Sequence, residues 1–181
     1  MRAVSAVGIH PTVPTTRCLN PHPQGLGTQA LTLNLMYLWP VWAPQQTFAK
    51  FHQEVTTASS SGFLRAGLYK NDYANGGPLM SSLLWDGGQV SSGTTGMKSW
   101  TSQTIPFPGG IAWFALVAQT SACTIRSSLV GSLRHLIMSG TPAANTAYGG
   151  RTLASVTGAL PTSGSPADAA FTQPYIFLEA A

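Results

Sequence analysis

Five carboxylates are the first residues of this 181-residue chain to consider for acid–base chemistry. They are Glu54, Asp72, Asp86, Asp168 and Glu179. Glycoside hydrolysis needs two carboxyl groups about 5–10 Å apart in a cleft, and both Asp72 and Asp86 lie in glycine-rich segments that could meet. Aspartate more commonly forms turns, because its side chain accepts hydrogen bonds from the backbone just after it. We therefore expect Asp72 and Asp86 to shape turns.

Histidine and cysteine form no recognisable catalytic or metal-binding pattern. His52 and Glu54 could share a metal ion or a proton, but no third ligand is in view, and a solvated strand face is the simpler interpretation. Cys123 and His135 could act as nucleophile and base, although closeness in sequence is not evidence for this. We expect Cys18 and Cys123 to be free thiols. Because nucleophile-elbow, phosphate-loop, HExxH and CxxC motifs are missing, we predict a non-enzymatic protein without a metal or cofactor.

Aromatic residues in or beside predicted loops are better candidates for a ligand site. Flat aromatic faces suit sugar rings, and amide or charged neighbours can bond sugar hydroxyls. The candidate glycan contacts are Tyr73, Tyr148, Asn71, Asp72, Asn75 and Arg151. Trp39, Trp42, Trp85 and Trp100 are also candidates for ligand contact, but we expect the tryptophans to lie mainly in the core or between subunits.

The element that positions the rest is predicted at residues 111–117. Every residue there is apolar, and the preceding prolines and Gly109-Gly110 favour a turn. A short apolar run bounded by turn residues is typical of a strand buried on both faces. We predict that this strand lies in the middle of a sandwich.

Other strands follow from alternating apolar and polar residues and from turn signals about every dozen residues. We predict them at residues 31–42, 48–57, 63–70, 79–85, 97–104, 124–130, 153–156 and 174–178. Residues 71–78 should form a long loop, residues 86–88 a turn, and most of 139–173 irregular coil. Pro40 and Pro44 indicate that the first strand ends at an edge or a bend. The expected fold is all-β, a two-sheet antiparallel sandwich of the jelly-roll kind.

The composition limits the classes of function. Charged residues make up 8% and hydrophobic residues 44% of the chain, and the net charge of +4 arises because acids are few. The basic residues are scattered, so we expect no nucleic-acid binding. No segment predicts a signal peptide or membrane insertion. A surface with so little charge favours permanent assembly.

Residues 1–34 differ from the rest. Prolines and glycines interrupt them, and neither a helical nor a strand period holds. We predict an extended N-terminal arm that becomes ordered on a partner, followed by a sandwich domain at 35–181. The residues expected to dock are Val4, Val7, Ile9, Pro11, Val13 and Pro14.

The order of several short segments resembles a β-sandwich module of tail and other appendage proteins of tailed bacteriophages. The segments are residues 36–44, 51–58, 65–72, 76–78, 86–96, 108–115 and 153–161. The resemblance covers roughly residues 35–178. It implies a virion surface component, commonly trimeric and often concerned with host-surface recognition. It implies no particular binding residues.

We therefore expect a structural component of a phage virion, made in the host cytoplasm. The favoured role is a tail-fibre or baseplate-attached subunit, anchored by its arm and exposing the sandwich to a host polysaccharide. Its partners would be other virion proteins and further copies in a homotrimer. The alternatives are a capsid decoration or head-fibre protein that stabilises the shell, a free carbohydrate-binding module, and a hydrolase with a loop-borne acid pair.

Overall fold

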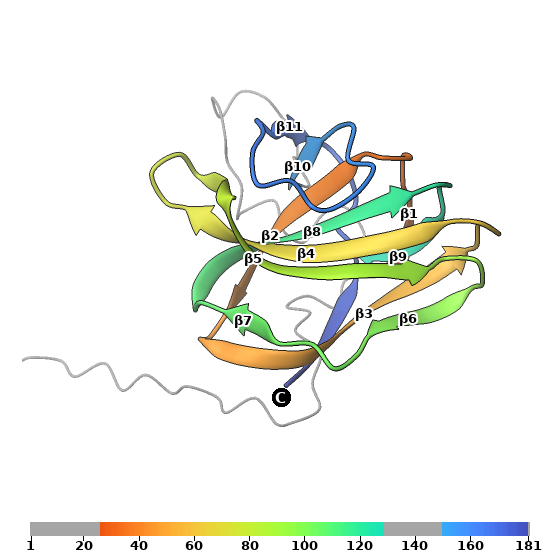
Figure 1. Ribbon diagram of the computed structural model, residues 1–181, viewed down its shortest axis with the longest axis horizontal. Helices are drawn as coiled ribbons and strands as arrows, with labels where there is room; N and C mark the ends of the chain where they lie inside the picture. Colours follow the sequence, from red (N-terminus) through yellow and green to blue (C-terminus); the bar gives the residue numbers. More distant parts are fainter. Residues whose placement is uncertain (1–25, 129–149, 181) are drawn as a thin grey trace, which may run out of the picture.

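The computed structural model describes residues 26–128 and 150–180, which fold into two antiparallel six-stranded sheets packed face to face (Figure 1). The strands are β1 (Leu26–Ala30), β2 (Met36–Ala43), β3 (Gln46–Thr57), β4 (Phe63–Asp72), β5 (Gly77–Ser91), β6 (Gly96–Trp100), β7 (Ile105–Phe107), β8 (Gly110–Gln119), β9 (Thr124–Ser128), β10 (Gly150–Leu153), β11 (Ala167–Ala169) and β12 (Ile176–Ala180). The predicted all-β, two-sheet antiparallel sandwich is confirmed. Its jelly-roll-like strand order stays a prediction. Within the described residues there is no helix that could cross a membrane.

Strand β8 is central, as predicted. The sheet that contains it has the order β11-β10-β2-β8-β4-β5, and β8 pairs with β2 and β4 along nearly its whole length. The other sheet has the order β1-β9-β3-β12, with β6 and β7 also paired to β3. Because successive side chains point to opposite faces, Ala112, Phe114 and Leu116 join the core between the sheets, whereas Trp113 and Ala115 join a second core on the outer face.

Aromatic rings dominate the core between the sheets. The ring of Phe51 lies 5.1 Å from that of Trp100 and 5.4 Å from that of Phe114, between centroids. The indole N–H of Trp85 donates to Gln103 Oε1 at 2.9 Å, and that of Trp100 donates to the Gly88 carbonyl at 3.0 Å. Trp85 and Trp100 are thus core residues, as expected.

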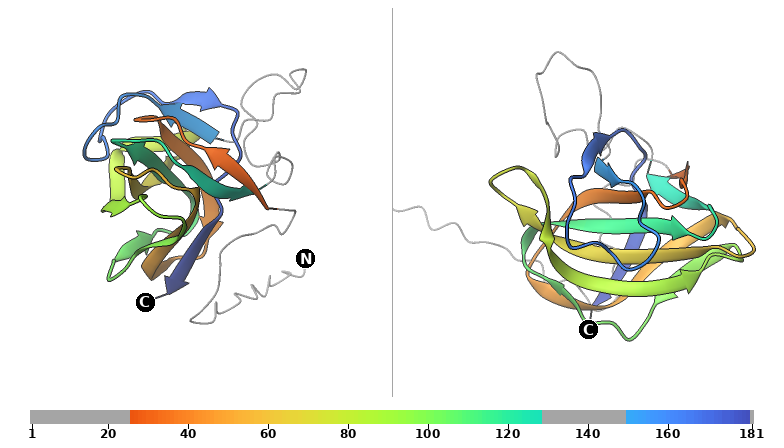
Figure 2. Two further views of the ribbon diagram at one scale, coloured as in Figure 1. Left: turned by 90° about the vertical axis from the view of Figure 1, so that its right-hand side faces the viewer. Right: turned by 45° about the horizontal axis from the view of Figure 1, so that its top comes forward.

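Residues 154–164, which we call the strap, cover the outer face of the β8 sheet (Figures 1 and 2). Val156 and Leu160 of the strap are buried against Met36, Tyr69 and Trp113. Leu160 lies so close to β4 that a side chain at Gly67 would collide with it. The strap therefore closes a second hydrophobic core and explains why β8 is buried on both faces.

Hydrogen bonds from three side chains of the β8 sheet hold the strap. Tyr69 Oη donates to the Pro161 carbonyl at 2.8 Å, and Gln119 Nε2 donates to the Gly158 carbonyl at 2.7 Å. Asp86 Oδ2 accepts from the backbone N–H of Leu160 at 3.2 Å. Because each bond satisfies a strap backbone group, the irregular segment is held without strand pairing.

The boundary between arm and sandwich differs from the sequence prediction. Residues 26–34 were assigned to the arm, but β1 pairs with all five residues of β9, and Leu31 is buried in the main core. Residues 26–31 therefore belong to the sandwich. The arm residues Val4, Val7, Ile9, Pro11, Val13 and Pro14 lie outside the described residues. Pro40 lies inside β2, although prolines were expected at the end of this strand. Strand β10 pairs only with residues 36–38 of β2, so the missing N–H of Pro40 removes no hydrogen bond between β2 and β10.

The turn predicted at residues 86–88 is wrong. Strand β5 continues through it, and two residues between Asp86 and Gln89 lie opposite one residue between Arg65 and Gly67. This is a β-bulge, and Gly88 supplies the positive φ of 70° that an extra residue commonly needs. Arg65 binds both carboxylate oxygens of Asp86, at 2.8 and 2.7 Å, and fixes the bulge against β4.

Candidate ligand-binding surface

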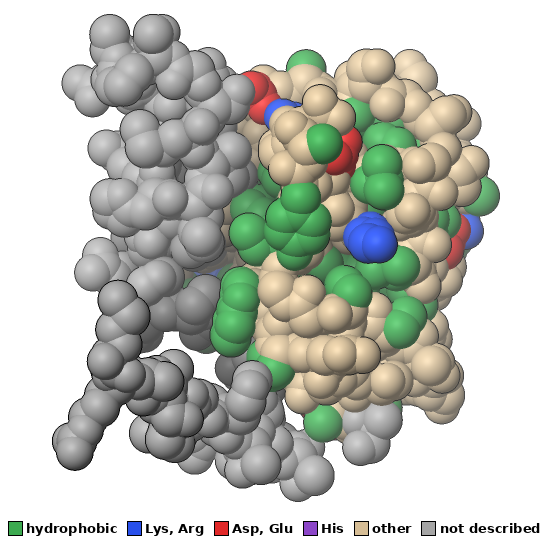
Figure 3. Space-filling view, turned by 90° about the vertical axis from the view of Figure 1, so that its left-hand side faces the viewer, with side chains coloured by type: hydrophobic (Ala, Val, Ile, Leu, Met, Phe, Trp, Pro, Cys, Tyr) green, Lys and Arg blue, Asp and Glu red, His purple; other side chains and the backbone are tan. Residues whose placement is uncertain are grey.

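Two large aromatic side chains are exposed at one end of the β8 sheet. The exposed fractions are 62% for Trp42 and 69% for Tyr73. Trp42 pairs across strands with Ile111, and the Ile111 N–H donates to Tyr73 Oη at 3.4 Å. We call Trp42, Ile111 and Tyr73 the aromatic platform. Figure 3 looks at this end and shows hydrophobic side chains gathered there, with few charged groups between them.

The two-residue period of β2 places Trp42 on this surface. Trp39 and Val41 point into the core between the sheets, so Leu38, Pro40 and Trp42 point to the outer face. Leu38 is fully buried in the second core, whereas Trp42, near the end of the strand, is exposed. We predicted Trp42 to lie in the core or between subunits; it does not lie in the core of this chain, and its burial between subunits stays a prediction.

A tight hairpin between β4 and β5 positions Tyr73. Asp72 Oδ1 accepts from the backbone N–H groups of Ala74 and Asn75 at 3.0 and 3.2 Å, and Asn75 Nδ2 donates to Asp72 Oδ2 at 2.7 Å. The Asn75 bond is the main reason that the pKa of Asp72 lies below its usual range. The predicted turn role of Asp72 is confirmed. The long loop predicted at residues 71–78 is instead a short turn between paired strands.

Beside the platform, four polar and aromatic side chains form a connected cluster. The Trp113 indole N–H donates to the buried Oδ1 of Asn71 at 2.7 Å. The guanidinium carbon of Arg151 lies 5.9 Å from the Trp113 ring centroid, and Arg151 Nε donates to Asp168 Oδ1 at 3.0 Å. The structure thus brings Asn71 and Arg151 together around Trp113.

Of the six predicted glycan contacts, five are described, and all lie at this end of the β8 sheet. Tyr73 is exposed, Asn71 is buried, and Asp72 and Asn75 bind each other within the hairpin. Tyr148 lies outside the described residues. Trp42 was weighed as a ligand contact but expected mainly in the core or between subunits, because its strand is entirely apolar and the sequence does not show which side chains are exposed. Asp168 was not predicted as a site residue, because its pairing with Arg151 cannot be inferred from sequence spacing.

On the opposite sheet, His52 lies between a hydroxyl and a carboxylate. His52 Nδ1 is 2.8 Å from Ser99 Oγ, and its Nε2 is 3.0 Å from Glu179 Oε1. The order resembles a nucleophile, a base and an acid, but it follows from strand register, since Ser99 lies directly opposite His52. Glu179 also binds Lys50 Nζ at 2.6 Å. His52 thus has partners other than Glu54, with which we considered a shared metal or proton.

Three of the carboxylates considered for acid–base chemistry have partners within the fold. Asp72 binds its own hairpin, Asp86 binds Arg65, and Glu54 accepts two bonds from Arg126 at 3.0 Å. In residues 26–128 and 150–180, no cluster of three histidine, cysteine or acidic side chains could hold a metal ion. Cys123 is a buried free thiol, and burial raises its pKa.

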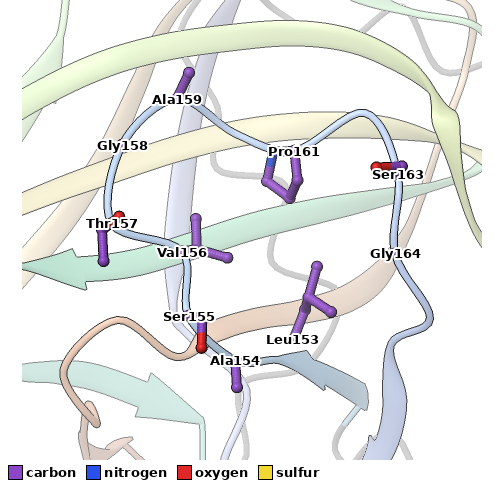
Figure 4. Close-up of a pocket in the computed structure, with 10 residues that line it drawn as sticks. All are labelled: Leu153, Ala154, Ser155, Val156, Thr157, Gly158, Ala159, Pro161, Ser163 and Gly164. Atoms are coloured by element: carbon purple, nitrogen blue, oxygen red, sulfur yellow. The ribbon is translucent and has the colours of Figure 1, made fainter.

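The strap encloses an open hollow of about 340 Å³, which Figure 4 shows in close-up. Its lining residues are Leu153, Ala154, Ser155, Val156, Thr157, Gly158, Ala159, Pro161, Ser163 and Gly164. These residues offer backbone groups and three hydroxyls but no charged or aromatic side chain. The hollow therefore lacks the chemistry that makes the aromatic platform the stronger candidate.

Comparison of the chain with protein-family models, with curated proteins and with solved structures found no match.

Proposed function

We propose that this protein is a non-enzymatic component of a bacteriophage virion and that its aromatic platform binds a host-surface glycan. The observation that carries the glycan proposal is the exposure of Trp42 and Tyr73 on either side of Ile111. Large aromatic side chains are normally buried, and exposed ones in one patch are typical of binding sites. Sugar rings present C–H faces that pack on aromatic rings, and hydroxyls that bond to polar neighbours.

The virion part of the proposal rests on the order of segments that resembles phage appendage proteins. The favoured role is a tail-fibre or baseplate subunit, anchored by residues 1–25 and assembled with other virion proteins as a homotrimer. A capsid decoration or head-fibre protein is the alternative within this class. A free carbohydrate-binding module would use the same platform without an anchored N-terminal segment.

Two measurements test the two parts separately. Immunogold labelling of intact particles with antibody to residues 26–181 should mark the tail; label over the head would favour a decoration protein, and unlabelled particles would refute the virion role. Purified full-length protein should bind host cells, and treating the cells with periodate, which cleaves sugar diols, should abolish binding. Unchanged binding after periodate would refute glycan recognition.

A further inference from the structure

We infer that the ion pair of Arg151 and Asp168 is a sugar-diol site and that the bound glycan is neutral. The inference rests on the proposed glycan function and names its ligand class. A guanidinium beside a carboxylate offers N–H donors and an oxygen acceptor side by side. Two neighbouring hydroxyls of a sugar match this pair, because one can accept from the guanidinium while the other donates to the carboxylate.

Among the described residues, the ion pair leaves atoms that suit a sugar diol without a partner. Arg151 Nε binds Asp168 Oδ1 at 3.0 Å. Within the described residues, no hydrogen bond engages the two Nη groups of Arg151 or Oδ2 of Asp168. The side chains of Arg151 and Asp168 are 19% and 29% exposed, so both are partly desolvated and still reachable.

The guanidinium of Arg151 is held in place. It lies over the Trp113 ring, with 5.9 Å between its carbon and the ring centroid. Its Nη1 lies against the backbone of Gly77, where a β-carbon would be only 2.1 Å away. A guanidinium fixed between a ring and a glycine loses little conformational entropy when it binds a ligand.

The ion pair lies next to the aromatic platform. Trp113 and Ile111 point to the same face of β8 and are two residues apart, a rise of about 7 Å. A sugar chain resting on Trp42 and Tyr73 therefore extends to the ion pair within one or two sugar units. The platform supplies ring packing, and Arg151 with Asp168 selects the hydroxyl pattern.

The charges at this site favour a neutral ligand. Arg151 is the cation, and its positive charge also helps to lower the pKa of Asp72, after the larger effect of the Asn75 hydrogen bond. Two carboxylates, Asp72 and Asp168, thus act on one guanidinium. Because no positive charge is in excess within this group, a sugar that carries a carboxylate or phosphate gains no net attraction there.

The test uses the full-length protein on an array of immobilised bacterial polysaccharides, both neutral and rich in uronic acids, each printed native and after periodate oxidation. We expect binding to native neutral polysaccharides and loss of binding to their oxidised copies. Arg151→Lys and Asp168→Asn should each weaken binding about tenfold, the usual effect of losing one or two hydrogen bonds to a charged group.

Matched controls come from the other sheet, where Arg126 binds Glu54 in a similar ion pair. Arg126→Lys and Glu54→Gln should leave binding unchanged. Tighter binding to uronic-acid polysaccharides, or normal binding by folded Arg151→Lys and Asp168→Asn proteins, would overturn this inference alone. Failure to bind every polysaccharide would overturn the glycan function and this inference together.

Discussion

Replacement of Leu160 by alanine tests whether the strap is an integral part of the fold. Leu160 is 4% exposed and packs in the second core with Met36, Tyr69 and Trp113. Leucine-to-alanine changes at buried sites cost about 2–5 kcal/mol, depending on how far the site relaxes. The strap is a connecting segment that can partly collapse, so we expect a loss of about 2–3 kcal/mol in the free energy of unfolding.

Urea unfolding followed by tryptophan fluorescence measures this loss. With a urea dependence of about 2 kcal/mol per molar, the midpoint of Leu160→Ala should fall by about 1 M. Leu33→Ala is the matched control, because Leu33 is 43% exposed and its truncation should change the free energy by less than about 0.5 kcal/mol. If the two variants unfold at the same urea concentration, the strap does not close a second core and the reasoning is refuted.

Three further predictions concern the polar groups. Burial alone would raise the pKa of Asp86, but bonds from Arg65 and from the N–H groups of Gly88 and Leu160 outweigh it and hold the pKa below its usual value. The ionised carboxylate therefore stabilises the fold above about pH 4, and this stabilisation is lost as the pH falls through the lower pKa of the folded state. On acidification, the melting temperature of Asp86→Asn should fall by less than that of the parent protein. An equal fall would contradict the stabilising role of the Asp86 carboxylate. In a Cys18→Ser variant, the buried Cys123 thiol should react with a disulfide reagent only after denaturant is added, so rapid reaction of the native protein would be the opposing result. Ser99 should not be labelled by a fluorophosphonate, and labelling there would contradict the non-enzymatic proposal.

Local sequence patterns were sufficient where the burial of a strand did not depend on distant segments. The apolar run at residues 111–117 predicted β8 correctly, because a short apolar run bounded by proline and glycine is typical of a strand covered on both faces. Leu64, Ala66 and Leu68 point into the main core, as their alternation predicted. The apolar end of the chain likewise formed β12.

Long-range contacts decided the elements that the sequence missed. Strand β1 exists because it pairs with β9, almost a hundred residues later, and nothing within its short, glycine-containing sequence indicates that partner. The glycines after Asp86 suit a turn and a bulge equally well, and the register with β4 selected the bulge.

The candidate site was predicted in part for the same reason. Tyr73, Asp72 and Asn75 lie in one short hairpin, so their closeness follows from sequence. Trp42 lies in a strand that is entirely apolar, so its exposure does not follow from the sequence pattern. The pairing of Arg151 with Asp168 depends on the register of β10 with β11, in a region that we predicted as mostly coil.

Binding of glycan by platform variants is the most direct test of the central claim. Full-length Trp42→Ala, Tyr73→Ala and the double variant would be titrated with a polysaccharide extracted from host cells. Met97→Ala would be the control, since Met97 is an exposed hydrophobic side chain on the other sheet. Each aromatic truncation should cost about 2 kcal/mol, or roughly thirtyfold in affinity, and the control should bind normally. Parental affinity in the folded double variant would show that the aromatic platform is not the binding surface.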